Sequence, residues 1–331
     1  MTAASDSPVA VLGAGNMGTA LAHQIARNGH LVRAWSIETD VLEEIRDHHR
    51  STKYLEGVAL HPNVAVAFDL AEAVADASLI IVSVPSQIVA KIAPDLAPCF
   101  QTGQAVLNVG KGMYEGRRLS QVLVDALGES AATTTGSMGG PAIAIEMAKD
   151  VPTAVVISVP DEAACNRVQR IIQNESLKVE ATTDVVGLEL CSTMKNVYAI
   201  ALGMCDGLGY GTNTKAFLTN IALGEMSAIS TAFGGRPETA SGLAGMGDLL
   251  TTGFSQHSRN RTLGDRMASG ADWQEFLRTN TVEGVDACKA IKDLTHDQAL
   301  DTPLLDTIYE MLFLERPPED TVRRFFTDFT Y

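Results

Sequence analysis

An aspartate in a glycine-rich turn, followed by two arginines that flank an asparagine, is the part of the sequence with the clearest capacity for chemistry. The aspartate is Asp248, within residues 242–250, and the arginines are Arg259 and Arg261 on either side of Asn260. The planar guanidinium fork of arginine matches a phosphate or a carboxylate. This segment therefore predicts a site for a small anion. The same residues would also suit a helix-capping loop with a solvated basic turn, and the segment alone leaves both readings open.

A second candidate is a lysine inside a helix of small and aliphatic residues, which the pattern predicts from Thr183 to about Met204. Lys195 has Cys191 and Ala199 one turn away on the same face. Burial can lower the pKa of an amine by up to ~3–5 units, which turns a lysine into a general acid or base near neutral pH. The alternative is a lysine whose stem covers apolar surface while its amine stays in water.

The N-terminal region has the pattern of a dinucleotide-binding turn. A short apolar run at residues 8–12 leads directly into the glycine-rich residues 13–18, and a helical pattern follows. In such a turn Gly13 permits the tight bend, Gly15 lets the backbone approach a pyrophosphate, and Gly18 lets the helix pack on the strand. The helix N-terminus then offers unpaired N–H groups to the phosphates. The expected cofactor contacts here are Gly13, Gly15, Asn16, Met17 and Gly18.

Further apolar runs alternate with helical stretches, which predicts a doubly wound parallel sheet. In such sheets ligands bind at the carboxyl ends of the strands. Three sequence features fall at such ends, namely Pro85, Lys111 and Gly140, although Pro85 also reads as a simple turn residue. The expected strands after the first are Leu31–Ser36, Ser78–Pro85, Ala105–Val109 and Pro152–Val159.

The choice between NAD and NADP depends on the end of the second strand, where an acidic residue would bind the ribose and an arginine would accept a 2′-phosphate. Residues 35–40 contain no cation, and Glu38 lies at the expected distance after Gly18. The sequence therefore favours NAD, with NADP possible. Glu38 could instead belong to the first turn of the next helix, where the helix dipole favours a carboxylate.

A chain of 331 residues exceeds the ~250–300 residues at which single cores stop growing, so we expect two domains. Strand-like runs give way to helices near Thr183. We therefore predict an α/β N-terminal domain, Rossmann-like and doubly wound, over residues 1–183. An all-α C-terminal domain carrying the substrate and catalytic residues should span residues 184–331.

Composition excludes several classes of partner. The formal charge of −15 argues against nucleic acid, because a phosphate backbone would be repelled. No uncharged apolar run approaches the ~20 residues of a membrane helix, and the N-terminus does not read as a secretory signal. The five cysteines are scattered without CxxC spacing, which is typical of reduced thiols in a cytoplasmic protein and of neither a metal site nor a disulfide framework.

Several ordered motifs together resemble the NAD(P)-dependent glycerol-3-phosphate dehydrogenase family, over Val9 to about Pro303. The motifs lie at residues 13–22, 84–86, 111–112, 140–141, 152–153, 195–201, 206–209, 242–249, 258–260 and 283–284. The resemblance implies reversible hydride transfer between a nicotinamide and C2 of dihydroxyacetone phosphate or sn-glycerol 3-phosphate. It also implies a small phosphorylated substrate, a homodimer, and a place in cytoplasmic glycerophospholipid metabolism.

The resemblance also implies roles for individual residues. Lys195 would exchange the proton on the C2 oxygen, Asp248 would hold and tune Lys195, and Lys111 would add positive charge beside the substrate oxygen. Arg259 and Asn260 would hold the phosphate. Further substrate contacts are implied for Lys111, Gly140, Asn196, Thr252 and Ser258, and further cofactor contacts for Trp35, Ile37, Glu38, Pro85, Lys111, Ala144, Arg259 and Glu283.

The chain departs from the family pattern at several positions near the expected site. Ala142 and Ile143 stand where relatives usually have a hydroxyl residue and phenylalanine, and Met17, Ile221 and Gly253 also differ. A paralogue that acts on another phosphorylated ketone or aldehyde is therefore an alternative. Two further alternatives are an NAD(H)-sensing protein without turnover, and a 6-phosphogluconate- or 3-hydroxyacyl-type dehydrogenase. The first would not need Lys195 and Asp248 together, and the second would lack the segment from Asp248 to Asn260.

Overall fold

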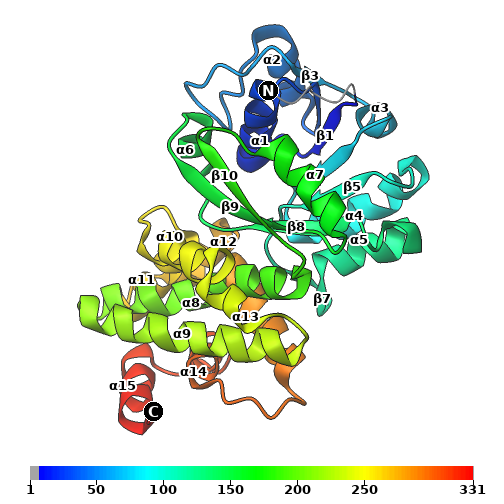
Figure 1. Ribbon diagram of the computed structural model, residues 1–331. Coiled ribbons are helices and arrows are strands. Elements are labelled where there is room, and N and C mark those ends of the chain that lie inside the picture. Colours follow the sequence, from blue (N-terminus) through cyan, green and yellow to red (C-terminus); the bar gives the residue numbers. More distant parts are fainter. Residues whose placement is uncertain (1–6, 331) are drawn as a thin grey trace. The chain divides into compact units, whose positions relative to one another are not determined.

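The computed structural model describes residues 7–330 and divides the chain into two compact units (Figure 1). Unit 1 comprises the chain up to Gly110 and Arg117–Val185, and unit 2 comprises Lys111–Gly116 and the chain from Val186 onward. The division thus falls two residues after the predicted boundary at Thr183. It also assigns the short segment Lys111–Gly116 to unit 2, which a single cut in the sequence does not anticipate.

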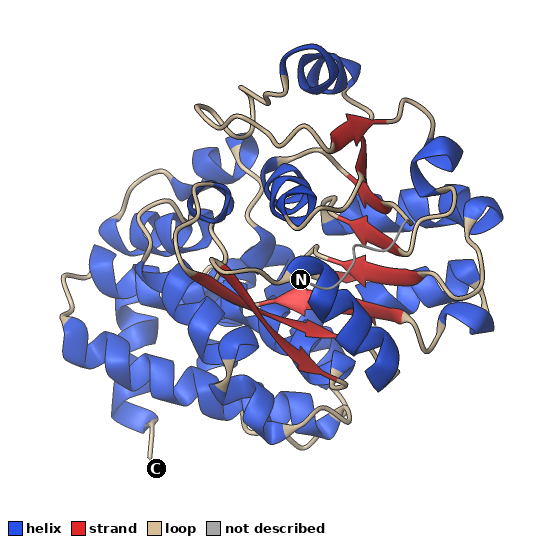
Figure 2. Ribbon diagram, turned by 45° about the horizontal axis from the view of Figure 1, so that its top comes forward, coloured by secondary structure: helices blue, strands red, loops and turns tan. Residues whose placement is uncertain are grey.

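Unit 1 is built on an eight-stranded sheet with the order β10-β9-β8-β5-β4-β1-β2-β3 (Figure 2). All neighbouring pairs run parallel except β8 and β9, which are antiparallel. The strands are β1 (Val9–Leu12), β2 (Val32–Trp35), β3 (Val64–Val66), β4 (Leu79–Val82), β5 (Ala105–Asn108), β8 (Thr135–Gly139), β9 (Thr153–Ser158) and β10 (Leu177–Thr182). Two short strands, β6 (Met113–Tyr114) and β7 (Arg117–Arg118), lie outside this sheet.

The five apolar runs that predicted strands form β1, β2, β4, β5 and β9, whereas β3, β8 and β10 were not predicted. Strand β8 reads Thr-Gly-Ser-Met-Gly, so mostly small residues and one methionine replace the usual aliphatic run, although all five are buried. The antiparallel step between β8 and β9 was also not anticipated. A continuous apolar run indicates burial on both faces and carries no information on strand direction.

Two groups of helices belong to unit 1. Helix α1 packs with α6 and α7, and α4 packs with α3 and α5. The first strand supplies the centre of the core, since all four of its residues are completely buried. The helices are α1 (Asn16–Arg27), α2 (Thr39–His48), α3 (Leu70–Val74), α4 (Ser86–Leu96), α5 (Leu119–Leu127), α6 (Ala144–Ala148) and α7 (Glu162–Ile172), with 3₁₀ turns at Ala97–Cys99 and Glu129–Ala131.

In unit 2 all the described residues from Val186 onward form helices and their connections, as expected. The helices are α8 (Val185–Gly207), α9 (Thr212–Ala232), α10 (Asp248–Phe254), α11 (Arg259–Ser269), α12 (Trp273–Thr279), α13 (Glu283–Thr295), α14 (Pro303–Phe313) and α15 (Pro318–Asp328). A 3₁₀ turn at Pro237–Ser241 and a π-helical turn at Leu243–Gly247 precede α10.

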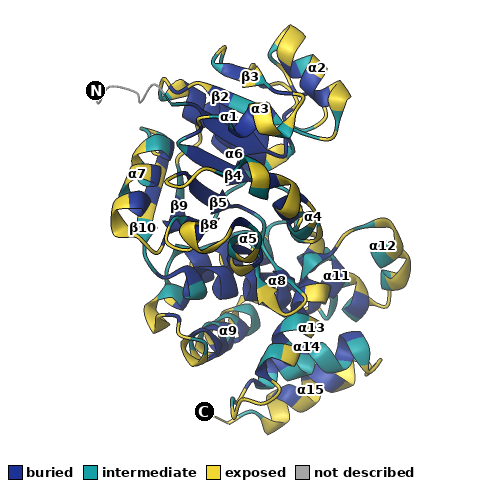
Figure 3. Cartoon of the chain, turned by 90° about the vertical axis from the view of Figure 1, so that its right-hand side faces the viewer, coloured by how far each residue is buried: buried dark blue, intermediate teal, exposed yellow. Residues whose placement is uncertain are grey.

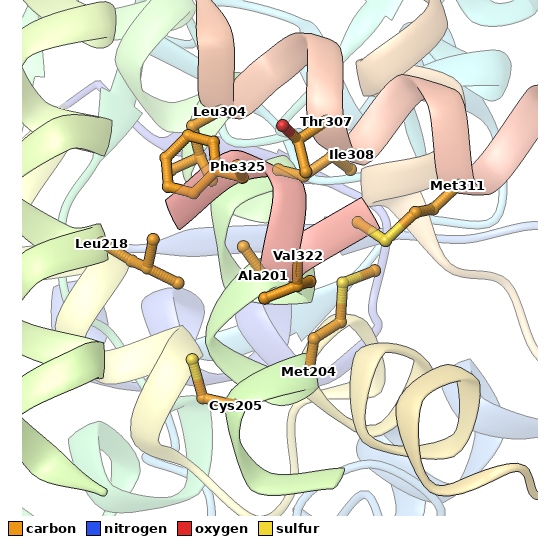
Figure 4. Close-up of a pocket in the computed structure, with 10 residues that line it drawn as sticks. All are labelled: Ala201, Met204, Cys205, Leu218, Leu304, Thr307, Ile308, Met311, Val322 and Phe325. Atoms are coloured by element: carbon orange, nitrogen blue, oxygen red, sulfur yellow. The ribbon is translucent and has the colours of Figure 1, made fainter. Parts of the chain in front are cut away.

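Helix α8 is the centre of unit 2, and its residues are mostly buried (Figure 3). It is the one helix of the described chain that is long and apolar enough to cross a membrane, but 94% of its most apolar window is buried inside the protein. A core helix has the same composition, so no membrane span is indicated. A small apolar cavity lies between α8, α9, α14 and α15 and is lined by residues such as Ala201, Leu218, Ile308 and Phe325 (Figure 4).

Candidate active site and cofactor-binding turn

Lys195 lies in the middle of α8 with only 6% of its surface exposed. Its Nζ donates a hydrogen bond of 2.7 Å to Thr252 Oγ1 and forms an ion pair of 3.0 Å with Asp248 Oδ1. The amine is therefore held inside the protein by a carboxylate and a hydroxyl, and it does not reach out to bulk water as the alternative reading required. Thr252 follows Asp248 by one helical turn on α10, which places both partners on one face of that helix.

A π-helical turn directly precedes Asp248 and places its carboxylate beside Lys195. Residues Leu243–Gly247 form the turn, in which the Gly247 N–H donates to the Gly242 carbonyl five residues earlier. Glycine is required at Gly245, because a Cβ atom there would lie 2.0 Å from the Ala240 carbonyl oxygen. Single π-helical turns are frequent at functional sites. The glycines that stood out in the sequence thus shape the backbone that carries the buried carboxylate.

Asp248 binds two ammonium groups, one on each carboxylate oxygen. Lys111 Nζ donates to Asp248 Oδ2 at 2.5 Å, while Asp248 Oδ1 faces Lys195. Burial alone would raise the pKa of Asp248, but the charges of Lys111 and Lys195 outweigh it and hold that pKa below its ordinary value. The aspartate is therefore ionised at neutral pH and neutralises one of the two cations.

The pKa of Lys195 is lowered from 10.5 to about 8, mainly by burial and secondarily by the positive charge of Lys111. Asp248 and Glu283 oppose this shift with their negative charges. An amine with a pKa near 8 populates both protonation states close to neutral pH, which suits a general acid and base. Lys195 has the electrostatic environment of a proton-transfer group.

A chain of hydrogen bonds passes through Asn196, the sequence neighbour of Lys195, and links α8, α11 and α13. The backbone N–H of Gly284 donates to Asn260 Oδ1 at 2.9 Å, and Asn260 Nδ2 donates to Asn196 Oδ1 at 2.9 Å. Asn196 Nδ2 in turn donates to Glu283 Oε2 at 3.2 Å. The sequence singled out Asn196, Asn260 and Glu283 separately, and the structure brings all three together.

Helix α11 begins at Arg259, the residue expected to hold a phosphate. Ser258 is its N-cap, and Ser258 Oγ accepts a hydrogen bond from the Arg261 N–H. The Arg259 side chain is exposed and makes no hydrogen bond or ion pair with any residue that the structure describes. Arg261 instead pairs with Asp206 at 2.6 Å, so the two arginines of the motif have different tasks.

Glycine contacts fix α11 against α8. A Cβ atom on Gly203 would lie 1.9 Å from the Arg261 carbonyl oxygen, and one on Gly264 would lie 1.9 Å from the Ile200 carbonyl oxygen. The two backbones therefore touch without intervening side chains. This close crossing brings the N-terminus of α11, with Asn260, to the stretch of α8 that carries Asn196.

The N-terminal turn of unit 1 fits a dinucleotide. Gly13 has a φ of +108°, and a Cβ atom there would meet the Ser83 carbonyl oxygen at 2.4 Å. A Cβ atom on Gly18 would lie 1.9 Å from the Gly13 carbonyl oxygen, whereas Gly15 has open space on its exposed side. Gly15 is the N-cap of α1, and no side chain caps the helix. The turn thus leaves backbone N–H groups at a helix N-terminus for a pyrophosphate.

The end of β2 differs from the expectation in one respect. Glu38 is the N-cap of α2, and its carboxylate accepts from Lys53 Nζ at 2.7 Å and from the Tyr54 hydroxyl at 2.6 Å. The stretch itself contains no cation, as the sequence indicated, but the fold supplies one from a loop that sequence reasoning did not consider. The Lys53 and Tyr54 bonds hold the pKa of Glu38 below its ordinary value.

The remaining predicted residues of unit 1 lie at strand ends or helix starts. Pro85 is the N-cap of α4, and Gly140 follows β8 with a φ of +102° and a Cβ position 3.2 Å from the Val155 Cα. The others are Trp35 at the end of β2, exposed Ile37 after it, Asn16 and Met17 in the first turn of α1, and Ala144 at the start of α6.

Comparison with known proteins shows the family of the chain. The model of the NAD-dependent glycerol-3-phosphate dehydrogenase N-terminus matches residues 8–165, and the model of the C-terminus of the same family matches residues 184–323. The chain belongs to the NAD-dependent glycerol-3-phosphate dehydrogenase family. It is 36% identical to glycerol-3-phosphate dehydrogenase [NAD(P)+] of Chlorobium limicola, with 95% of this chain and 96% of that one aligned.

Other relatives of this dehydrogenase cover the chain to the same extent. A second curated glycerol-3-phosphate dehydrogenase [NAD(P)+], from Salinibacter ruber, is 38% identical over 96% of this chain and 94% of its own. The crystal structure of glycerol-3-phosphate dehydrogenase from Coxiella burnetii superposes with a TM-score of 0.89 at 30% identity, covering 97% of this chain and 99% of that one. The fold class is confirmed, and the protein is an NAD(P)-dependent oxidoreductase rather than a sensor without turnover.

Proposed function

We propose that this dehydrogenase catalyses the reversible NAD(P)H-dependent reduction of dihydroxyacetone phosphate to sn-glycerol 3-phosphate, with Lys195 as proton donor and acceptor. The observation that carries the proposal is the buried cluster in which Asp248 holds Lys195 at 3.0 Å and Lys111 at 2.5 Å. A sensing protein has no use for a buried ammonium group and a buried carboxylate with a second, 19% exposed ammonium group beside them. Proton transfer is most efficient when the pKa of the catalytic group lies near the working pH, and burial lowers the pKa of Lys195 to about 8.

Lys195 would act at the oxygen on C2. In the reduction, the bound cofactor supplies the hydride that C2 gains, and the C2 oxygen takes a proton from Lys195 Nζ. In the oxidation, the neutral amine takes the proton back from the hydroxyl. Asp248 and Thr252 hold Nζ in one position, and the positive charge of Lys111 stabilises the negative charge that develops on the oxygen.

The phosphate would bind at the N-terminus of α11. The exposed guanidinium of Arg259 can clamp a phosphate with two parallel hydrogen bonds, and the helix N-terminus adds backbone N–H donors. Asn260 supplies a side-chain N–H, and the Ser258 hydroxyl remains able to donate while it caps the helix. Each of these groups favours a dianionic phosphate over a neutral end group.

We further propose NAD over NADP as the preferred cofactor, since Glu38 keeps Lys53 paired at the end of β2. The proposed setting is a cytoplasmic homodimer that supplies glycerol 3-phosphate for glycerophospholipids. The cysteines support the compartment, because all five are free thiols.

A second candidate is the same chemistry on another small phosphorylated ketone or aldehyde. It is favoured by Ala142 and Ile143, which remove a hydroxyl group beside Gly140. Oxidation of NADH against dihydroxyacetone phosphate, glyceraldehyde phosphate and phosphate-free dihydroxyacetone, measured in parallel, decides between the two substrates.

The role of Lys195 is tested with Lys195→Ala. Turnover should fall by about 10²–10⁴-fold, the usual contribution of general acid–base catalysis, while the affinity for NADH measured by fluorescence titration stays close to that of the wild type. Equal losses of turnover and NADH affinity would make Lys195 a structural residue and end the proposal.

A further inference from the structure

The hydrogen-bond chain Gly284–Asn260–Asn196–Glu283 runs in a single direction. It starts at a backbone N–H, which can only donate, and ends at a carboxylate, which accepts. Between these ends, each amide accepts with its oxygen and donates with its nitrogen. Asn196 is 1% exposed and Asn260 is 7% exposed, so the two ends, and not water, determine how both amides are turned.

The direction of the chain decides what Asn260 offers to a ligand. Its Oδ1 is engaged by Gly284, and its Nδ2 uses one N–H on Asn196. The second N–H of Nδ2 has no partner among the residues that the structure describes. If the Asn260 amide were rotated by half a turn, Oδ1 and Nδ2 would exchange places. Phosphate oxygens would then meet Oδ1, an acceptor, instead of an N–H donor.

The carboxylate end is supplied by Glu283, the first residue of α13, which is half-buried and touches Asn196 rather than Asn260. Its neighbour Gly284 must be glycine, since a Cβ atom there would lie 2.5 Å from the Asn196 carbonyl oxygen and 2.7 Å from Asn260 Oδ1. The first turn of α13 therefore supplies both ends of the hydrogen-bond chain: Gly284 is the donor at one end, and Glu283 is the acceptor at the other.

We propose that Glu283 is a positioning residue that holds the amide of Asn196 and, together with the Gly284 N–H, keeps Asn260 in its donor orientation, which strengthens the binding of phosphate. Glu283 can have this role only if phosphate binds at Arg259 and Asn260, as the proposed function requires. The carboxylate acts as an acceptor, so its hydrogen-bonding capacity would favour phosphate binding, whereas its negative charge would oppose it. Its charge has a separate effect, because it raises the pKa of Lys195.

Two variants separate the acceptor from the charge. Glu283→Ala removes both, whereas Glu283→Gln removes the charge and keeps an amide oxygen that can accept from Asn196 Nδ2. We expect Glu283→Ala to weaken binding of inorganic phosphate, measured by titration calorimetry, and to raise KM for dihydroxyacetone phosphate, each by about tenfold or more. Glu283→Gln should stay within about threefold of the wild type in both measurements.

The two variants should agree in a second readout, the pH profile of kcat. Both lose the charge that raises the pKa of Lys195, so both profiles should move to lower pH by a similar amount. Asp286→Ala, which removes an exposed carboxylate from the same first turn of α13, serves as the matched control and should change neither readout. A urea-unfolding midpoint close to that of the wild type shows that each variant is folded.

The outcomes that overturn the inference are distinct from those that overturn the proposed function. Equal loss of phosphate affinity in Glu283→Gln and Glu283→Ala would show that an amide acceptor at this position does not restore binding, and it would end the inference. No loss in either variant, with a clear loss in Arg259→Ala, would leave the phosphate site in place and remove Glu283 from it. If Arg259→Ala also leaves phosphate binding unchanged, the assigned phosphate site itself is wrong.

Discussion

Lys195 and Asp248 form an ion pair of 3.0 Å in which both partners are almost fully withdrawn from water, with side-chain exposures of 8% and 2%. Isolated buried charges are costly, and a pair offsets this cost only if its remaining hydrogen-bonding capacity is used. Thr252 Oγ1 accepts a hydrogen bond from the amine, and Lys111 Nζ donates to the second carboxylate oxygen. The arrangement leaves one net positive charge in the cluster, which suits a site where an oxygen becomes negative during the reaction.

The pH dependence of turnover should report the pKa of Lys195, which lies near 8. Ketone reduction needs the protonated amine, so its rate should fall as pH rises through about 8. Alcohol oxidation needs the neutral amine and should rise over the same range. Initial rates in both directions under saturating substrate provide the measurement, and profiles that move in the same direction would contradict the acid–base assignment.

Removal of the Lys111 charge should shift the fall in the rate of ketone reduction to higher pH. Lys111 lowers the pKa of Lys195, so Lys111→Met should extend ketone reduction to higher pH while it reduces turnover. Lys149→Met removes an exposed ammonium group from unit 1 and should leave the profile in place. If the rate of ketone reduction falls at the same pH in Lys111→Met as in the wild type, Lys111 does not act on the Lys195 amine electrostatically.

The contact between α8 and α11 should not tolerate a methyl group at Gly264. The added Cβ would lie 1.9 Å from the Ile200 carbonyl oxygen, so α11 must move. We expect Gly264→Ala to destabilise the protein by about 1–3 kcal/mol in urea unfolding and to raise KM for dihydroxyacetone phosphate, because Arg259 and Asn260 move with the helix.

Gly224→Ala is the matched control, since Gly224 lies exposed within α9 and nothing is within 4 Å of its Cβ position. It should stabilise the protein by up to about 1 kcal/mol through helix propensity. Equal stability of the two variants would argue against a backbone contact between α8 and α11.

Acid should destabilise unit 1 through His23. Burial lowers the pKa of this imidazole from 6.5 to about 4, with smaller effects from Arg27 and His61, and its Nδ1 accepts from the His61 N–H at 3.0 Å. The unfolded chain takes up the proton first, so stability is lost as pH falls from about 6.5 to about 4. At about 1.36 kcal/mol per pKa unit the loss is about 3 kcal/mol.

His23→Asn keeps an acceptor near the Nδ1 position without a titrating group and should flatten this loss. Exposed His48→Asn should not. Urea unfolding at pH 7 and pH 5 measures both differences. If His23→Asn loses as much stability between pH 7 and pH 5 as the wild type does, groups other than His23 cause the loss.

The opposite pH dependence is expected in unit 2 from Glu225. Its carboxylate accepts from the Leu304 and Leu305 N–H groups and from the Tyr198 hydroxyl, and burial raises its pKa from 4.5 to about 7 against the effect of those donors. The unfolded chain ionises first, so stability should fall as pH rises from about 4.5 through about 7, by about 3 kcal/mol.

Glu225→Gln should remove that decline, whereas exposed Glu238→Gln should retain it. Unfolding of the helical unit, followed at pH 5 and pH 8, provides the test. Parallel declines in Glu225→Gln and the wild type would show that Glu225 does not titrate in this range.

Much of the fold could be predicted from the sequence because its signals are local. The glycine turn at residues 13–18, the buried runs of β1 and β4, and the apolar pattern of α8 each depend on neighbouring residues alone. Strand β8 could not be predicted, since its short run of mostly small residues is buried only because β5 and β9 flank it in the sheet. The direction of β9 against β8 is likewise set by tertiary packing.

For the site, the sequence alone determined which residues can do chemistry, because residue type fixes charge, proton capacity and hydrogen-bonding groups. Lys195, Asp248 and Arg259 were recognisable in this way. Only the tertiary structure decided which of them meet. The burial that brings the pKa of Lys195 to about 8, the Lys53 charge beside Glu38, and the one-way chain from Gly284 to Glu283 all join residues from separate elements. Solvent exclusion and amide orientation are properties of packed neighbours, and residue spacing along the chain does not encode them.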